Sequence, residues 1–93
     1  ILKKSIMQIF TTTMTTGTMV INREDGAMFI SIQPAENASC TVLGGISFNG
    51  VESTPLTLNS LQIASYAASS AASPLDGITI THISGDIDIL VGF

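Results

Sequence analysis

Charged side chains are scarce in this sequence. They make up 11% of its 93 residues, whereas a typical soluble domain carries about 25%. The net charge is −4, and the only basic residues are Lys3, Lys4 and Arg23. Binding to nucleic-acid phosphates needs a basic face, so this composition argues against a nucleic-acid partner. It also disfavours attraction to an anionic membrane surface, and no apolar run approaches the roughly 20 residues of a membrane span.

Aromatic residues and cysteine are scarce as well. The chain has no Trp, one Tyr and one Cys. The single Cys40 excludes a disulfide within the chain and suits synthesis in a reducing cytoplasm. Sugar-binding sites usually stack pyranose rings on exposed Trp or Tyr. A chain whose only candidate is Tyr66 is therefore a poor match to a carbohydrate-binding module.

Small apolar and hydroxyl side chains take the place of the missing charges. Hydrophobic residues reach 45% of the chain, and a domain of this size buries only about 60–65% of its unfolded surface. A lone monomer would be marginally stable and would expose apolar surface. We therefore expect a homo-oligomer, with a trimer as one candidate, or a subunit of a larger assembly. A monomer with a Ser/Thr-rich surface is the alternative.

Apolar and polar residues alternate with a period of two along most of the chain, which is typical of β-strands. Turn signals recur at steady spacing, at Asp25-Gly26, Asn49-Gly50 and Ser84-Gly85. Seven or eight short strands predict an all-β fold, a single antiparallel β-sandwich that is jelly-roll-like or immunoglobulin-like. The domain is expected to span residues 1–93, with residues 1–16 as a candidate extended arm.

Two of the turn signals predict hairpins between long strands. Ser84-Gly85 predicts a two-residue turn that places Ile80 opposite Ile89 on the core face. Asp25-Gly26 predicts a second hairpin, between TMVIN and AMFISIQ, with a loop of either two or four residues. In this second pair the alternation places one row of apolar side chains on a common face, namely Met19, Ile21, Met28, Ile30 and Ile32.

Two internal segments are less regular. In SCTVLGGISF, the same strand parity is shared by Cys40, Val42, Ile46 and Phe48. The Gly44-Gly45 pair inside this segment predicts a bulge or a sharp bend, and Asn49-Gly50 predicts the turn that follows. The segment LQIASYAASSAAS has the Ala content of a short helix, but no apolar stripe is sustained along it. We expect a strand through LQIASY followed by a loop.

Four residues are candidates for chemistry. Cys40 and His82 could act as a nucleophilic pair only if their side chains lay within hydrogen-bond reach. Both have core-face parity, so a small buried thiol and a hydrogen-bonded or interface histidine are expected instead. Asp86 and Asp88 share a strand face and are weak candidates for a cation such as calcium, which prefers six or more oxygen ligands. We predict no catalytic, cofactor-binding or metal site, no cofactor and no enzymatic activity.

The second half of the chain resembles a known group of proteins. Residues 46–93 contain, in this order, the segments FNG, STPLTL, SPLDGITIT and DIDILVGF. In these segments the chain is similar to small virion proteins of Bacteroidetes-infecting tailed phages, the crAss-like group among them. The resemblance implies a β-sandwich that serves as an auxiliary capsid, decoration or head-fibre protein, binds the outer shell and associates with copies of itself. It implies no catalytic or ligand-binding residues.

These observations lead to one main functional hypothesis and two alternatives. We expect a non-enzymatic phage virion structural protein, a capsid decoration or auxiliary head protein, made in the bacterial host cytoplasm and located in the virion. Its partners would be itself and the major capsid or other virion proteins, without nucleic acid or membrane. The alternative is a receptor- or carbohydrate-binding β-sandwich module of a fibre or adhesin. A third interpretation is a pilin-like subunit that donates the TTTMTTGTM segment as a strand.

Overall fold

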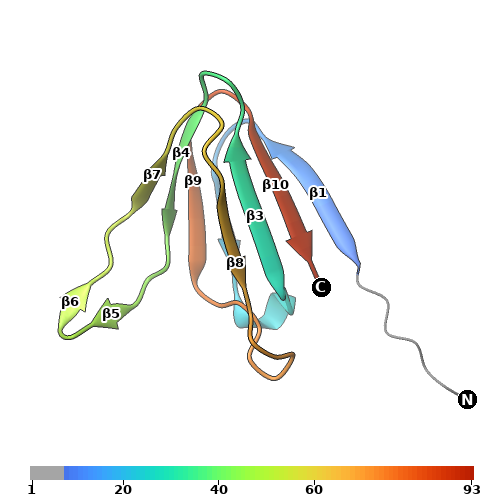
Figure 1. Cartoon of the computed structure of the whole chain (residues 1–93), viewed down its shortest axis with the longest axis vertical. Coiled ribbons are helices and arrows are strands. Elements are labelled where there is room, and N and C mark those ends of the chain that lie inside the picture. Colours follow the sequence, from blue (N-terminus) through green and yellow to red (C-terminus); the bar gives the residue numbers. More distant parts are fainter. Residues whose placement is uncertain (1–7) are drawn as a thin grey trace, which may run out of the picture.

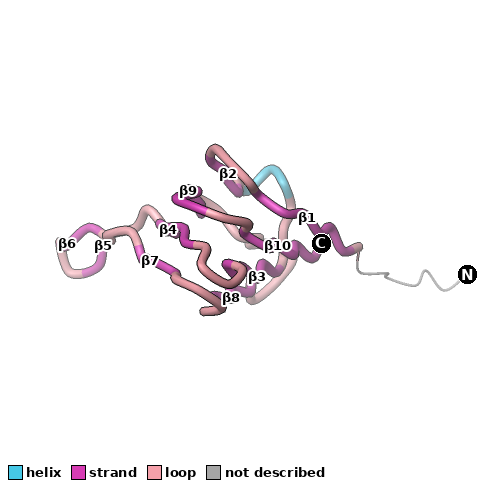
Figure 2. The backbone as a smooth tube through the Cα atoms, turned by 90° about the horizontal axis from the view of Figure 1, so that it is seen from above, coloured by secondary structure: helices cyan, strands magenta, loops and turns pink. Residues whose placement is uncertain are grey.

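Residues 8–93 form two facing four-stranded β-sheets in a computed structural model, which describes this part of the chain (Figure 1). Sheet 1 consists, in spatial order, of β1 (Ile9–Met14), β10 (Ile87–Gly92), β3 (Phe29–Pro34) and β8 (Ala64–Ala67). Sheet 2 consists of β2 (Thr18–Ile21), β9 (Ile78–Ser84), β4 (Ser39–Leu43) and β7 (Leu56–Leu58). Figure 2 shows the sheets as two layers, with a separate small hairpin beyond them, β5 (Ser47–Phe48) and β6 (Val51–Glu52).

The strand order is that of a long antiparallel ribbon rolled into a sandwich. Four pairings join the two halves of the ribbon: β1 with β10, β2 with β9, β3 with β8, and β4 with β7. Two further pairings, β10 with β3 and β9 with β4, roll the ribbon up. All six are antiparallel, and this arrangement is a jelly roll. The predicted all-β sandwich is confirmed, and the strand order matches the jelly-roll alternative rather than the immunoglobulin-like one.

The C-terminal hairpin predicted at Ser84-Gly85 is wrong. β9 lies in sheet 2 and β10 in sheet 1, so this turn crosses from one sheet to the other. Ile80 pairs with Met19 and Val42 instead of Ile89. Both isoleucines are nevertheless buried, as the alternation predicted. Two rows of apolar side chains can be buried side by side in one sheet or facing each other across the sandwich. The alternation of apolar and polar residues is the same in both arrangements, so it does not distinguish between them.

The hairpin predicted at Asp25-Gly26 is wrong for the same reason, because β2 and β3 belong to different sheets. A single-turn 3-10 helix, η1 (Arg23–Asp25), makes the crossing. The backbone N–H of Asn22 donates to Asp25 Oδ2 (2.7 Å), and the backbone N–H of Arg23 donates to Asp76 Oδ1 (3.0 Å). Side-chain acceptors thus stabilise a connection between the two sheets at a dipeptide that by itself predicted a hairpin.

The turn predicted at Asn49-Gly50 is confirmed as the two-residue loop between β5 and β6. Asn49 and Gly50 both have positive φ, 53° and 79°, as a type I′ hairpin turn requires. The strand expected through LQIASY is present only in part, because β8 begins at Ala64 and continues to Ala67. Residues 61 to 63 precede it outside any strand.

The core lies between the sheets and consists of aliphatic side chains. Ile30, Ile32, Ile80 and Ile87 are fully buried. Inward and outward residues alternate along the long strands, as in β3 and β4. Within residues 8–93, no buried side chain is polar or charged. The fold therefore depends on burial of branched aliphatic groups, each contributing about 1.5–3 kcal/mol when fully removed from water.

The candidate extended arm, residues 1–16, lies partly outside the described residues and partly in sheet 1. Residues 1–7, which include Lys3 and Lys4, lie outside the described residues. Residues 9–14 form β1 and pair with β10, so this part belongs to sheet 1. In the part of the chain that the structure describes, no helix is long and apolar enough to cross a membrane.

Candidate functional site

Cys40 and His82 lie directly opposite each other on the neighbouring strands β4 and β9. The Cys40 side chain is fully buried, and burial raises the pKa of its thiol, which disfavours the nucleophilic thiolate. The His82 ring donates from Nε2 to the backbone carbonyl of Gly85 (2.6 Å). The imidazole therefore closes the β9–β10 turn, and the structure places these two residues together without forming an accessible nucleophile.

Cys40 is expected to resist thiol reagents in the folded protein. Labelling requires local opening of β4 together with deprotonation of a thiol whose pKa is raised by burial. Reaction with Ellman's reagent should be roughly 100-fold or more slower in buffer than in urea-unfolded protein. Equal rates in the two conditions would show that the thiol is accessible and would reopen its candidacy as a nucleophile.

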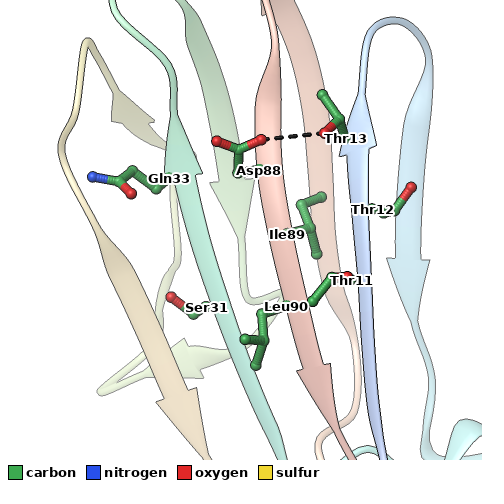
Figure 3. A pocket seen from close by; sticks show the side chains of 8 residues that line it. All are labelled: Thr11, Thr12, Thr13, Ser31, Gln33, Asp88, Ile89 and Leu90. Carbon is green, nitrogen blue, oxygen red and sulfur yellow. Dashed lines mark hydrogen bonds between the residues drawn. The ribbon is translucent and has the colours of Figure 1, made fainter.

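The expectation that Asp86 and Asp88 share a strand face is wrong, because β10 begins at Ile87, between them. Asp86 lies in the β9–β10 connection, where its backbone carbonyl accepts a hydrogen bond from the Ala35 N–H (2.8 Å). Asp88 lies on the outer face of sheet 1, where its Oδ1 accepts a hydrogen bond from the Thr13 hydroxyl (3.2 Å; Figure 3). No group of three or more His, Cys, Asp or Glu residues within positions 8–93 is arranged to hold a metal ion.

The outer face of sheet 1 around Asp88 is slightly hollowed (Figure 3). The hollow has a volume of about 460 Å³ and is lined by Thr11, Thr12, Thr13, Ser31, Gln33, Asp88, Ile89 and Leu90. Its lining offers hydroxyl groups, one amide and one carboxylate for hydrogen bonding. It contains no aromatic ring for sugar stacking, and an open sheet face does not exclude water as a catalytic pocket does.

Tyr66 does not supply the missing ring. It lies on β8 opposite Ile30, a fully buried residue, and therefore has the parity of the core side of sheet 1. On the outer face, β8 contributes Ser65, which pairs with Ser31. The only tyrosine of the chain thus points away from the face that carries the hollow.

The hairpin of β5 and β6 is the most exposed apolar feature among the described residues. We call residues 46–52 the apolar finger. Phe48 and Val51 lie opposite each other, so they share one face of the hairpin, and Ile46, two residues before Phe48, shares it too. These three side chains are 68%, 76% and 70% exposed for Ile46, Phe48 and Val51. Ser47 and Glu52 form the opposite, polar face.

The finger is closed at its base. The Ser53 N–H donates to the Ile46 carbonyl (2.8 Å), and the Ile46 N–H donates to Ser53 Oγ (3.2 Å). Gly45, with a φ of 63°, turns the chain from β4 into the hairpin. The finger therefore presents one apolar face beyond the end of the two layers, beside β4 and β7 (Figure 2).

Sequence reasoning missed the finger. Val42, Ile46 and Phe48 share a strand parity on either side of the predicted bend, but of these three side chains only Val42 is buried. A signal was present: Gly44-Gly45 and Asn49-Gly50 enclose a segment too short to cross the sandwich. A short apolar stretch between a bend and a type I′ turn indicates a protruding hairpin.

Comparison of the chain with protein-family models, with curated proteins and with solved structures finds no match.

Proposed function

We propose that this protein is a non-enzymatic structural subunit of a larger assembly, in which the apolar finger packs against a neighbouring copy. The observation that carries the proposal is the exposed apolar face of the finger, formed by Ile46, Phe48 and Val51. The sequence resemblance extends the proposal to a phage virion, with the protein as a capsid decoration or auxiliary head protein that also contacts the shell.

Energetic considerations favour an assembly contact. Full burial of an Ile, Phe or Val side chain contributes about 1.5–3 kcal/mol, which is substantial for three adjacent side chains. Association loses translational and rotational freedom, so a single finger contact would be weak. In a symmetric assembly several such contacts form together, and their combined strength exceeds that of each one. The low charge of the chain reduces electrostatic repulsion between the copies.

The carbohydrate-binding alternative has weaker support. Its best location is the hollow on sheet 1, where the Asp88 carboxylate, the Gln33 amide and two outer-face threonine hydroxyls supply hydrogen-bonding groups. The residues that line the hollow include no aromatic side chain. An open polar face without a stacking ring matches weakly the sites that sugars usually occupy.

The test replaces Phe48 by Ser and measures the native mass of the purified chain by light scattering over a series of protein concentrations. The wild type should reach masses above that of a monomer, and Phe48→Ser should shift the part of this association that the finger mediates to roughly tenfold or higher concentrations, since about 1.4 kcal/mol corresponds to a tenfold change. Ser47→Ala, on the polar face of the same hairpin, is the matched control and should associate as the wild type does. A wild type that is monomeric at every concentration would contradict the proposal.

A further inference from the structure

The sandwich has four edge strands among the described residues, and β1 is the longest of them. β1 has six residues, β2 and β8 have four each, and β7 has three. Within residues 8–93, β1 pairs with β10 alone and lies at the edge of sheet 1. Its register with β10 runs through all six pairs without a shift, so no bulge bends this edge away from a second strand.

β1 also lacks the other features by which proteins protect a sheet edge. Its sequence, IFTTTM, contains no charged residue, no proline and no glycine, whereas protected edges usually carry Lys, Pro or a bulge. Ile, Phe and Thr favour the extended conformation. Ile9 and Phe10 are 60% and 50% exposed, so a strand added at this edge would cover apolar surface.

The hydrogen bonds to β10 determine which residues of β1 face the open edge. The Phe93 N–H donates to the Gln8 carbonyl (2.9 Å), just before the first pair of the β1–β10 ladder. Bonded and non-bonded pairs alternate along an antiparallel ladder. Phe10, Thr12 and Met14 therefore bond to β10. The residues that alternate with these three direct their N–H and C=O groups to the opposite side, namely Ile9, Thr11 and Thr13.

We propose that β1 pairs antiparallel with β1 of a second copy, about a two-fold axis at Thr11, and so joins two copies of sheet 1 into one continuous sheet. In this register Thr11 lies opposite Thr11, and Ile9 lies opposite Thr13 of the other copy. Each of these pairs has its polar backbone groups at the open edge and can exchange two hydrogen bonds. A register shifted by two residues would form fewer hydrogen bonds between the two β1 strands. The interface deepens the proposed function, since it rests on the protein being an assembly subunit.

A second copy is the occupant that this edge fits best, because the edge is complementary to itself. Rotation about the two-fold axis brings outer-face residues beside outer-face residues and core-side Phe10 beside core-side Thr12. No charged side chain belongs to β1, so the rotation opposes no like charges within the strand pair. β1 and the apolar finger lie at opposite ends of the sandwich (Figure 2), so one subunit can use both surfaces at once.

The decisive test introduces charged side chains at Thr11, where the two-fold axis lies. The variants are made in the Phe48→Ser protein, in which the finger contact is weakened. The Thr11 variant proteins and their parent are measured at the same concentration by gel filtration with light scattering. The parent is expected to have the mass of two chains. Thr11→Lys and Thr11→Glu should each halve it, because the axis places the two like charges directly opposite each other. An equimolar mixture of the two variants should restore the two-chain mass, since opposite charges then meet.

Two further variants separate the interface from folding and from overall charge. Thr11→Pro removes an N–H that points to the open edge and leaves the ladder to β10 intact, so it should keep the circular-dichroism spectrum while halving the mass. Thr81→Lys changes the net charge by the same amount on the exposed outer face of sheet 2 and should keep the two-chain mass.

The possible outcomes distinguish this interface from the proposed function. Folded Thr11→Pro and Thr11→Lys proteins that keep the two-chain mass would overturn the β1 interface, and so would a mixture that fails to restore it. A one-chain mass for the Phe48→Ser parent would overturn it as well, while association of the wild type through the finger would still support the assembly role. A wild type that never associates would overturn both.

Discussion

Removal of residues 87–93 abolishes folding: the truncated chain is expected to show the circular-dichroism spectrum of an unfolded polypeptide and no cooperative thermal transition. β10 is an inner strand of sheet 1, between β1 and β3. It contributes three buried side chains to the core, Ile87, Ile89 and Val91. Burial of each of these side chains contributes about 1.5–3 kcal/mol to the free energy of unfolding. The net stability of a whole domain is only about 5–15 kcal/mol, so the loss of all three is expected to unfold the chain.

A point substitution measures the same dependence without removing the strand. Ile89→Ala should lower the free energy of unfolding by about 2–5 kcal/mol in urea titrations. Leu90→Ala is the matched control, because Leu90 is the next residue and lies half-buried on the outer face of the sheet; its loss should be clearly smaller. A truncated chain that retains the native spectrum and melting temperature would show that β10 is dispensable, contrary to its position in the sheet.

Gly85→Ala is the second substitution with a large expected effect. A Cβ atom at Gly85 would lie 2.6 Å from the Cβ and 2.9 Å from the Cα of Ala38. Ala38 is buried in the β3–β4 connection, and neither of its atoms can turn away as the end of a flexible side chain would. Gly85 also has a φ of 71°, which disfavours any residue with a Cβ. We expect a loss of about 2–4 kcal/mol, the sum of overpacking and backbone strain.

Gly17→Ala separates these two contributions. Gly17 has a similar φ of 81°, but an added Cβ would meet no atom within 4 Å. It should therefore cost only about 1 kcal/mol, the strain of the left-handed backbone conformation. Both free energies of unfolding are obtained from urea titrations monitored by circular dichroism. Equal losses for the two variants would show that the chain around Ala38 moves aside freely.

A double-mutant cycle locates the contact itself. Ala38→Gly removes the Cβ that lies nearest to the one added at position 85. Combined with Gly85→Ala, it should recover part of the lost stability, so that the two effects are not additive. Additive losses would assign the effect of Gly85→Ala to its backbone conformation alone.

Gly85 illustrates what a local sequence pattern can and cannot predict. The dipeptide Ser84-Gly85 indicated a turn with positive φ, and Gly85 has that φ. The pattern did not indicate that the turn passes over Ala38 from one sheet to the other. A φ preference belongs to one residue, whereas the choice of sheet depends on strands as distant along the chain as β1, which pairs with β10.

For the candidate chemical residues, too, the local pattern predicted some features and not others. Parity alone predicted that Cys40 would be buried, and it is. The spacing of Asp86 and Asp88 said nothing about their surroundings, and the structure places one in a turn and the other beside Thr13. The exposed apolar face of the finger depended on where β4 ends. Gly44-Gly45 predicted a bend there, but parity did not show that Ile46 and Phe48 leave the core beyond it.

The sequence by itself determined the all-β class, the positions of most strands and which side chains of the long strands are buried. These features depend on alternation and turn propensity, which act over a few residues. Only the tertiary structure decided which strands pair, that the ribbon rolls into a jelly roll, and that Ile46 and Phe48 leave the core. Rolling the ribbon and stacking it as hairpins bury the same apolar rows, so the choice between them depends on packing between distant segments.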